Sequence, residues 1–214
     1  MTTTFKDLGL SDACVEQLEA IGFVEPTDIQ KQAIPSLLEG KDIFGQSQTG
    51  TGKTAAFSLP ALDLVDTGSK AVQVLILTPT RELAQQVGEA IKDFTGKRRL
   101  YVLNVYGGQS IERQISSLRR GVQVVVGTPG RVIDLLERGN LRLDELKVAV
   151  LDEADEMLSM GFIDDVKKIL RQSPSERQTA CFSATMPREI KDLIKHFLTS
   201  PVMIKVQQQE AAPT

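Results

Sequence analysis

Short apolar segments alternate along the chain with segments of helical periodicity, and this alternation constrains the fold more than any other feature. The segment 148–151 (VAVL), for example, is apolar at every position. A strand covered by helices on both faces has this pattern, whereas a strand with one side in solvent alternates between apolar and polar residues. The segments predicted to be strands are 42–46, 72–77, 101–106, 122–126, 148–151, 179–183 and 202–206. The sequence therefore predicts an α/β fold, with a mainly parallel sheet of about seven strands and helices on both faces.

Amphipathic helices are predicted around these strands. The clearest lies in the segment 83–94, where apolar residues recur at the spacing of one helix face. These residues are Leu83, Val87, Ala90, Ile91 and Phe94. Further helices are predicted over 132–136 and 190–197. Before the first strand, Ser11 is predicted to cap a helix that ends at Gly22.

The charge balance limits how this chain contacts nucleic acid. Its 214 residues include 25 Lys and Arg against 28 Asp and Glu, so the formal net charge is −3. A protein that coats nucleic acid through bulk electrostatics is usually strongly basic. Any nucleic-acid contact is therefore expected to be local.

Neither a structural metal nor a membrane partner is expected. Cys14, Cys181 and the single histidine, His196, lie too far apart in the sequence for a zinc-ligand spacing. Cys14 is interpreted as a core residue, and His196 as a solvated residue near a helix end. The first residues (MTTTFKDLGL) do not have the pattern of a signal peptide, and no segment approaches a membrane span. We expect a cytoplasmic protein.

The segment 47–54 (SQTGTGKT) is the sharpest functional signal, and it lies between a predicted strand and an apolar helix start. Gly50 and Gly52 allow backbone N–H groups to surround a phosphate. Lys53 supplies a positive charge to the β- and γ-phosphate oxygens, and the Thr54 hydroxyl can ligate Mg²⁺. The helix N-terminus adds a favourable dipole. The segment therefore predicts a phosphate-binding loop.

Ser47 departs from the general phosphate-loop pattern, which begins with Gly. A small residue still permits the turn. A glycine-rich turn without a ligand is the structural alternative. A dinucleotide-binding loop fits less well, because its third glycine is missing at position 55.

Acidic residues follow the predicted strand 148–151 directly. A phosphate loop needs a carboxylate at the end of a neighbouring buried strand, and Asp152 is predicted to hold Mg²⁺ there, directly or through water. Glu153 is predicted to orient or deprotonate an attacking water. Without the loop, the same residues would be interpreted as acidic residues at a helix N-terminus.

With these residues in place, the sequence resembles the DEAD-box family of ATP-dependent RNA helicases. Residues 152–155 spell DEAD, the motif after which that family is named. Other segments match the family's motifs in the family's order. They are 22–30 (GFVEPTDIQ, adenine recognition), 47–54 (motif I), 79–84 (PTRELA, motif Ia), 107–108 (the glycine doublet), 128–131 (TPGR, motif Ib) and 183–185 (SAT, motif III). At the first position of motif I the family usually has Ala, and this chain has Ser47.

The resemblance implies a site for ATP and Mg²⁺, with ADP or AMP as product or partial ligands. Lys53, Asp152 and Glu153 are the implied catalytic residues, and Thr54 and Asp152 the implied metal ligands. The nucleotide contacts are assigned to Phe5, Phe23, Thr27, Gln30, Ser47, Gln48, Thr49, Gly50, Thr51, Gly52, Lys53 and Thr54. The Gln30 amide can donate to N7 of adenine and accept from its amino group. Phe23 or Phe5 can stack on the purine, and each can equally belong to the core.

The resemblance also implies an RNA site and a coupling group. The residues assigned to single-stranded RNA are Thr80, Arg81, Gly108, Thr128, Pro129 and Arg131. Small hydroxyls, a glycine and two arginines suit a sugar-phosphate backbone that is gripped without base reading. Ser183 and Thr185 are predicted to bond Asp155 or Glu153, and so to link the γ-phosphate to the RNA site. Capping of the following helix is their structural alternative.

The resemblance implies that residues 1–206 form an N-terminal RecA-like ATP-binding domain, with the Q-motif lobe at 1–40. Residues 207–214 (QQQEAAPT) are predicted to be a polar tail or the start of an interdomain linker. No segment matches the His-Arg-x-Gly-Arg motif of the family's second RecA-like domain, which supplies arginine fingers and further RNA contacts. That second domain, absent here, is the implied partner in cis.

The whole enzyme implied by the resemblance is an RNA-stimulated ATPase that unwinds short RNA duplexes or remodels RNA–protein complexes. Its partners are single-stranded RNA or RNA duplex ends. Without the second domain, we expect adenine-nucleotide binding with little ATPase activity and no unwinding. Two other functions stay open: a P-loop kinase or metabolic NTPase, and a freestanding nucleotide- or RNA-binding module.

Overall fold

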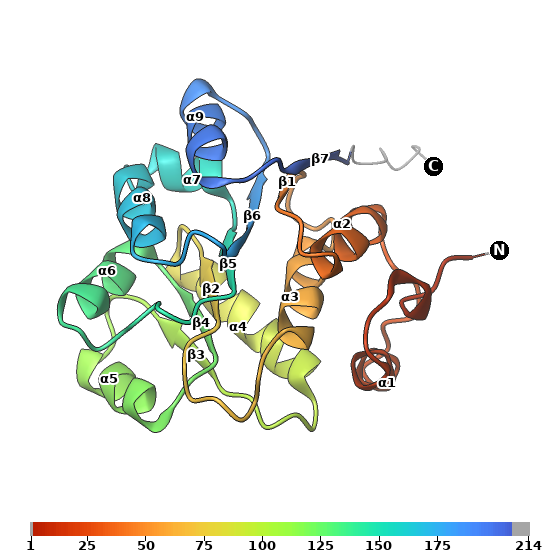
Figure 1. The fold of residues 1–214 in the computed structure, drawn as a ribbon, viewed down its shortest axis with the longest axis horizontal. Helices are drawn as coiled ribbons and strands as arrows, with labels where there is room; N and C mark the ends of the chain where they lie inside the picture. Colours follow the sequence, from red (N-terminus) through yellow and green to blue (C-terminus); the bar gives the residue numbers. More distant parts are fainter. Residues whose placement is uncertain (1, 207–214) are drawn as a thin grey trace.

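The computed structural model describes residues 2–206, and a seven-stranded sheet runs through the middle of this part of the chain (Figure 1). All strand pairs in the described residues are parallel. The strands are β1 (Ile43–Gln46), β2 (Val74–Leu77), β3 (Val102–Val105), β4 (Val124–Gly127), β5 (Val148–Leu151), β6 (Gln178–Ser183) and β7 (Val202–Lys205). The predicted α/β class is confirmed, and the mainly parallel sheet is wholly parallel in the described chain.

The strand order across the sheet is β3-β4-β2-β5-β6-β1-β7. Register is regular: Val74 of β2, for example, stands between Val124 of β4 and Val148 of β5. Because all strands are parallel, their carboxyl ends lie along one edge of the sheet. Residues that directly follow different strands are therefore brought together there.

The helices form two layers, one on each face of the sheet. Helices α1 to α4 and the short 3₁₀ helix η1 contribute to one hydrophobic cluster, and α5 to α9 pack on the other. The bounds are η1 (Lys6–Leu8), α1 (Asp12–Ala20), α2 (Asp28–Leu38), α3 (Lys53–Asp63), α4 (Arg81–Thr95), α5 (Ile111–Arg120), α6 (Pro129–Glu137), α7 (Ala154–Ser159), α8 (Ile163–Arg171) and α9 (Arg188–Phe197).

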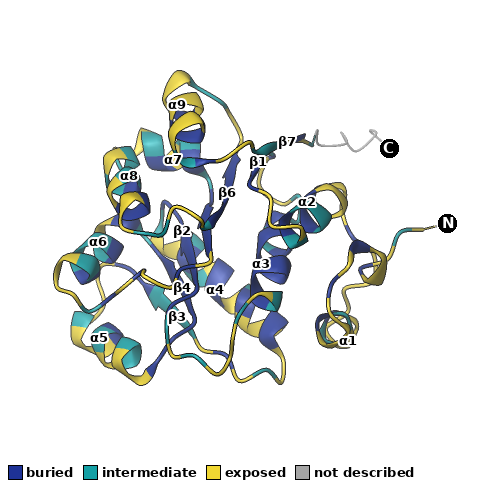
Figure 2. Cartoon of the chain, in the orientation of Figure 1, coloured by how far each residue is buried: buried dark blue, intermediate teal, exposed yellow. Residues whose placement is uncertain are grey.

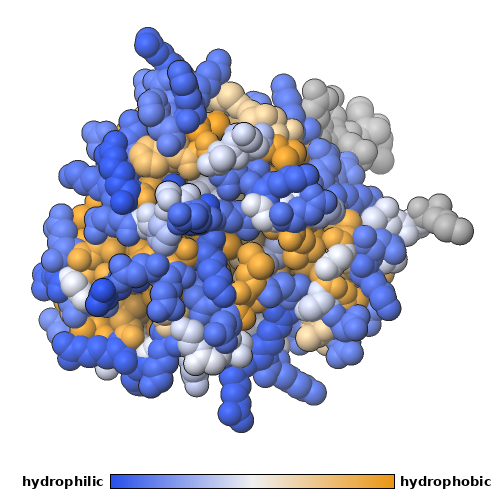
Figure 3. Space-filling model, viewed as in Figure 1, coloured by the Kyte–Doolittle hydropathy of each residue, from blue (hydrophilic) through white to orange (hydrophobic). Residues whose placement is uncertain are grey.

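Successive strand residues face opposite layers, so the inner strands are buried on both sides, as Figure 2 shows in dark blue, whereas the edge strands β3 and β7 are only partly buried. In β2, for example, Val74 belongs to the α1–α4 cluster and Leu75 to the α5–α9 cluster. This two-sided burial explains the continuous apolar runs of the sequence. On the face shown in Figure 3, polar side chains cover the helices and apolar residues show mainly between them.

The amino-terminal lobe docks on α3 and α4, and its first helix has the predicted cap. Ser11 caps α1, with its Oγ accepting a hydrogen bond from the Cys14 N–H at 3.2 Å. The helix ends at Ala20 with Ile21 as its C-cap, and Gly22 follows with a left-handed φ of +85°. The Ser11 hydroxyl also donates to Asp63 Oδ1 at 2.8 Å, which ties the lobe to the end of α3. Cys14 is buried and His196 is exposed, as predicted.

The predicted tail 207–214 lies outside the described residues. Among the residues that the structure describes, no helix has the length and apolar character needed to cross a membrane.

Candidate functional site

Most of the residues predicted from the sequence to be functional lie at the carboxyl edge of the sheet, whereas Phe23 packs against Phe94 near the far end of α4. The residues assigned to RNA follow β3, β4 and β2, whereas the phosphate loop, the acidic residues and the coupling residues follow β1, β5 and β6. The two assigned groups therefore meet between β2 and β5. One expectation needs correction: the acidic strand β5 does not adjoin β1, because β6 lies between them.

The predicted phosphate loop joins β1 to α3. Gly50 and Gly52 have φ values of +84° and +88°, the left-handed region that favours glycine. Gly52 is also the N-cap of α3, which begins at Lys53. Within the loop, the Thr51 hydroxyl donates to the carbonyl oxygen of Gln48 at 3.0 Å. The loop thus leads into a helix N-terminus, where free N–H groups and the helix dipole favour an anion.

The first position of this loop is buried. Ser47 is 3% exposed, and its N–H donates to the carbonyl oxygen of Ser183 at 3.2 Å. Its Oγ has no hydrogen-bond partner among the described residues. The small side chain is accommodated at the end of β1, so the departure from Ala does not prevent the turn.

A buried ion pair joins the loop to the acidic strand end. Lys53 Nζ lies 3.0 Å from Asp152 Oδ1, with the two side chains 7% and 0% exposed. Lys53 Nζ also lies 3.4 Å from Glu153 Oε1, and the Thr49 hydroxyl donates to that same oxygen at 3.4 Å. Lys53, Asp152 and Glu153, predicted as catalytic from three separate positions, therefore form one charged group.

The Asp152 carboxylate has an oxygen that is available to a further ligand. The ion pair with Lys53 lacks hydrogen-bond alignment, and neither Oδ1 nor Oδ2 has a hydrogen-bond partner in the described chain. Burial raises the pKa of Asp152 above its usual range, against the pull of the Lys53 ammonium. A buried carboxylate that accepts no hydrogen bond, beside a phosphate loop, fits Mg²⁺, which is typically held by one or two carboxylates together with substrate phosphates.

The other implied metal ligand and the implied base flank this pair. Thr54 is half-buried in the first turn of α3, directly after Lys53. Glu153 has a left-handed φ of +52°, which is uncommon for a residue with a side chain. This conformation turns the chain between β5 and α7, and it places the Glu153 carboxylate against Lys53 and Thr49.

The segment assigned to adenine recognition contacts the phosphate loop directly. The Thr27 N–H donates to Gln30 Oε1 at 2.9 Å, and Gln30 Nε2 donates to the carbonyl oxygen of Gly52 at 3.1 Å. Gln30 is 2% exposed, so its amide is committed to α2 and the loop in this structure. Sequence reasoning assigned Gln30 to the base alone and missed this bond. Adenine reading by Gln30 stays a prediction.

The two aromatic residues assigned to the purine differ in exposure. Phe5 is 3% exposed and belongs to the hydrophobic core. Phe23 is 37% exposed, and its ring packs edge-on against Phe94 with centroids 5.5 Å apart. Phe5 is therefore a core residue, which is the alternative that the sequence left open, whereas Phe23 is partly exposed. Stacking on adenine stays a prediction for both.

The residues assigned to coupling contact one another at the ends of β5 and β6. The Asp155 N–H donates to Ser183 Oγ at 3.2 Å. Asp155 Oδ2 accepts from the Thr185 N–H at 3.1 Å and from its hydroxyl at 2.9 Å. Thr185 does not cap the next helix, because α9 begins at Arg188 with Pro187 as its N-cap. The contacts are present, and their coupling role stays a prediction.

The residues assigned to RNA occupy two helix N-termini and the loop between β3 and α5. Thr80 caps α4, accepting from the Leu83 N–H at 3.2 Å, and Arg81 follows it. Thr128 is the N-cap of α6, and Pro129 is its first residue. Gly108 has a left-handed φ of +81°. These positions resemble an anion-binding surface built from helix N-termini.

The two arginines of this surface are held by neutral groups. The Arg81 guanidinium lies over the Tyr106 ring, 5.1 Å from its centroid. Arg131 Nη1 donates to Gln114 Oε1 at 3.0 Å and to the Gln109 carbonyl oxygen at 3.1 Å. Neither arginine forms an ion pair within residues 2–206. No salt bridge therefore competes with a phosphate for either guanidinium in the described residues. Sequence reasoning missed Tyr106 and Gln114.

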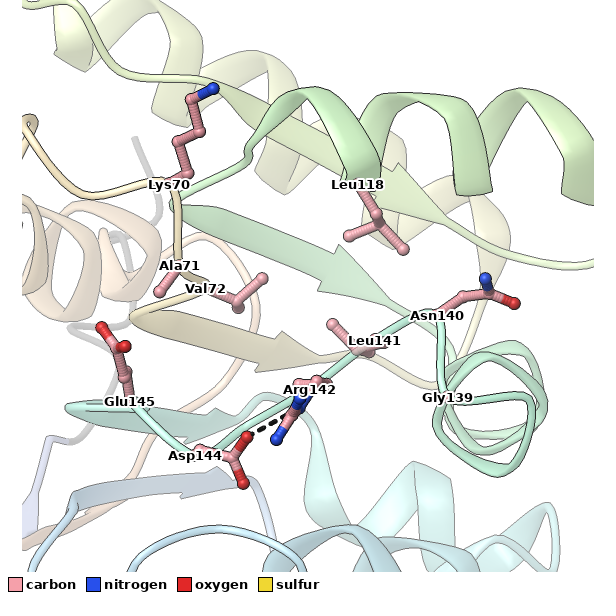
Figure 4. A pocket seen from close by; sticks show the side chains of 10 residues that line it. All are labelled: Lys70, Ala71, Val72, Leu118, Gly139, Asn140, Leu141, Arg142, Asp144 and Glu145. Carbon is pink, nitrogen blue, oxygen red and sulfur yellow. Dashed lines mark hydrogen bonds and ion pairs between the residues drawn. The ribbon is translucent and has the colours of Figure 1, made fainter.

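A separate surface hollow lies far from this edge. It has a volume of about 420 Å³ and lies beside the amino ends of β2 and β5, as Figure 4 shows. Its lining includes Lys70 and an ion pair between Arg142 Nε and Asp144 Oδ2 at 2.9 Å. None of the predicted site residues lines it. The chemistry expected from the sequence therefore lies at the opposite end of the strands.

The wholly parallel sheet, the loop after β1 and the acidic turn after β5 define a RecA-like domain with a phosphate-binding loop. Residues 27–193 match the family of DEAD/DEAH box helicases. The chain belongs to this family.

Relatives and solved structures agree with this assignment. The RNA helicase CrhR of Synechocystis is 65% identical over 214 residues, which is all of this chain and 43% of the relative. The DEAD-box ATP-dependent RNA helicase CshA of Bacillus cereus is 52% identical over 97% of this chain and 40% of the relative. A DEAD box protein crystal structure from Methanococcus jannaschii superposes with a TM-score of 0.92 and 44% identity, covering 95% of this chain and 56% of that one. The chain spans about two fifths of the curated relatives.

Proposed function

We propose that this chain is the ATP- and RNA-binding half of a DEAD-box RNA helicase. One observation carries the nucleotide part of this proposal: the buried pair of Lys53 and Asp152 places a cation and an unpartnered carboxylate oxygen at the phosphate loop. The cation suits the β- and γ-phosphates, and the carboxylate suits the metal that accompanies them.

The pair suggests how the site changes when it is filled. Lys53 releases Asp152 and turns to the phosphates, while the N–H groups of the loop surround them. Thr54 and Asp152 would hold Mg²⁺ beside the phosphates. When bound, Mg²⁺ supplies positive charge that offsets charge on the phosphate oxygens. Glu153, already within reach of Thr49, orients or deprotonates the attacking water.

Base recognition would require a second exchange of partners. The Gln30 amide donates to the Gly52 carbonyl oxygen in this structure, and the same amide would donate to N7 of adenine. The proposal therefore includes a movement of Gln30 from the loop to the base when adenine nucleotide binds. Phe23, which is partly exposed where Phe5 is buried, is the aromatic residue proposed to contact the purine.

RNA binding is proposed for the surface that contains Arg81 and Arg131. Helix N-termini, hydroxyls and two unpaired guanidinium groups suit phosphates and ribose without base specificity. The ligand class is single-stranded RNA or the end of an RNA duplex.

A second RecA-like domain in cis would complete this surface and supply arginine fingers, and the greater length of the relatives supports that expectation. The Asp155–Thr185 contact is the proposed coupling between the sites. We place this function in the cytoplasm, as predicted from the sequence.

Steady-state ATP hydrolysis with and without single-stranded RNA tests the proposal that efficient, RNA-stimulated hydrolysis requires a second RecA-like domain. An arginine finger is typically worth about 10³ to 10⁵ in rate, so the 214-residue chain alone should bind ATP and turn it over very slowly. Its rate should change little with RNA. Robust RNA-stimulated turnover by this chain would show that a second domain is not required.

A further inference from the structure

Tyr106 lies at the centre of the surface assigned to RNA, although no motif of the sequence includes it. It directly follows β3 and is 4% exposed. Its ring faces the Arg81 guanidinium, and its phenolic oxygen accepts a hydrogen bond from Gln85 Nε2 at 2.8 Å. Arg81 and Gln85 are four residues apart on α4, so both side chains reach the same side of that helix. The first turns of α4 therefore hold the tyrosine ring at its face and at its hydroxyl.

The backbone of Tyr106 leads to the second arginine. Its carbonyl oxygen accepts from Gln114 Nε2 at 3.2 Å, and Gln114 Oε1 accepts from Arg131 at 3.0 Å. Gln114 is 3% exposed, and it is the buried residue of the otherwise exposed or half-buried helix α5. A chain of contacts thus runs from Arg81 through Tyr106 and Gln114 to Arg131, across the ends of three neighbouring strands.

The kind of contact matters for the charge of Arg81. A carboxylate partner would orient the guanidinium but would also offset its charge, whereas an aromatic ring orients it and leaves the charge available. Arg81 is exposed, so its long side chain would otherwise sample many rotamers. A side chain that is ordered before binding loses less entropy when the ligand arrives.

The glycine doublet leaves room for this arrangement. A Cβ placed on Gly108 would lie 3.3 Å from Arg81 Nη1, closer than nine in ten real Cβ contacts. A side chain at residue 108 would crowd the stacked guanidinium of Arg81, and the left-handed φ of Gly108 separately favours glycine.

We propose that Tyr106 is a positioning residue that presents Arg81 to an RNA phosphate, with Gln114 giving the matching support to Arg131. This inference rests on the proposed RNA function and adds to it the residues that preorganise the surface. Tyr106 itself stays buried and acts through Arg81.

The affinity of the chain for a fluorescently labelled oligouridylate, measured by anisotropy over a range of salt concentrations, tests the proposal. The variants are Arg81→Ala, Tyr106→Met and Tyr106→Phe. Methionine fills a similar space without an aromatic face, whereas phenylalanine keeps the face and loses only the hydroxyl. Tyr101→Leu is the matched control, because Tyr101 is 66% exposed and precedes the same strand.

Arg81→Ala should weaken binding about fivefold and reduce the slope of log affinity against log salt by about 0.7, the value for one phosphate contact on a single strand. Tyr106→Met should lose about threefold, the size of a modest cation–π contact. Tyr106→Phe and Tyr101→Leu should stay within about twofold of the wild type. Adding Tyr106→Met to Arg81→Ala should cause no further loss, because the ring acts through the arginine.

The NMR resonance of the Arg81 Nε–H tests the contact with Tyr106 without RNA. This measurement on the wild type and Tyr106→Phe does not depend on whether Tyr106→Met folds. In the wild type and in Tyr106→Phe this resonance should show the upfield ring-current shift of a group over an aromatic face, which exposed Arg113 should lack. A wild-type Arg81 signal without that shift would overturn the positioning role. The role would also be overturned if Tyr106→Met bound RNA like the wild type, or if its loss added to that of Arg81→Ala. If the wild-type chain shows no salt-dependent RNA binding, the proposed RNA function itself fails, and the inference with it.

Discussion

Lys53 Nζ and Asp152 Oδ1 lie 3.0 Å apart in a pair that is almost completely buried. The two residues come from the loop after β1 and the turn after β5, with β6 between the two strands. Breaking a buried ion pair on one side leaves an uncompensated charge, whereas replacing both partners by apolar residues is often neutral. Replacing only one of these two site residues is therefore expected to destabilise the ligand-free protein.

Lys53→Met should lower the free energy of unfolding by about 3 kcal/mol, because Asp152 is then buried with no cation beside it. The double variant Lys53→Met with Asp152→Leu should recover most of this loss. Urea denaturation of the wild type and of both variants measures the difference. Equal losses in the single and the double variant would show that Lys53 does not stabilise the protein through its ion pair with Asp152.

Two glycines of the phosphate loop provide a matched comparison. Gly50 and Gly52 have nearly the same left-handed φ, but a Cβ on Gly50 meets nothing within 4 Å, whereas one on Gly52 would lie 2.6 Å from Gln30 Nε2 and 2.7 Å from Thr27 Oγ1. Gly50→Ala should cost about 1 kcal/mol of stability from backbone strain alone. Gly52→Ala should cost about 3 kcal/mol, because the loop must also move away from α2. Thermal unfolding compares the two, and equal costs would contradict the contact between the loop and Gln30.

Gln30→Glu separates two roles of one side chain. The carboxylate can still accept from the Thr27 N–H, but it cannot donate to the Gly52 carbonyl oxygen or to N7 of adenine. If Gln30 reads the base, ATP affinity should fall about tenfold, as expected for loss of a good bidentate contact, while GTP affinity stays nearly unchanged. Titration with both nucleotides measures this. An equal loss for ATP and GTP would mean that Gln30 only supports the loop.

The Asp155–Thr185 contact predicts a local change in amide exchange. Asp155 Oδ2 accepts from the Thr185 N–H and from its hydroxyl, so Asp155→Ala removes both bonds and Thr185→Val removes one. Exchange of the Thr185 N–H should become about fivefold faster in Asp155→Ala, since a lost bond is worth about 1 kcal/mol, and should change little in Thr185→Val. NMR-detected exchange measures both. If nucleotide alters this exchange in the wild type but not in Asp155→Ala, the contact carries the proposed coupling.

The parts of the site that depend on local sequence could be predicted. The residues 47–54 specify a loop between a strand and a helix through glycines at fixed places, and the structure has that loop. The contact between Asp155 and Thr185 was also predicted, because both follow strands whose ends share one edge of a parallel sheet. Periodicity identified α4, whose apolar face is long and continuous.

Contacts that depend on strand order could not be predicted. Nothing local indicates that β3 is an edge strand beside β4, so the position of Tyr106 under Arg81 follows only from the assembled sheet. The bond from Gln30 to Gly52 likewise joins residues 22 positions apart on different elements. Helix α5 was missed although Ile111, Ile115 and Leu118 recur on one face, because its remaining residues are polar or charged.

Calorimetric titration of the chain with ATP, with and without Mg²⁺, tests the central claim most directly. The site of Lys53 and Asp152 predicts saturable binding that is strengthened by Mg²⁺, abolished in Lys53→Ala, and unchanged in Lys41→Ala, which removes an exposed lysine paired with Glu39. The assignment of this loop and carboxylate as the nucleotide site would be contradicted if ATP bound equally tightly to Lys53→Ala. It would also be contradicted if Mg²⁺ did not change the affinity for ATP.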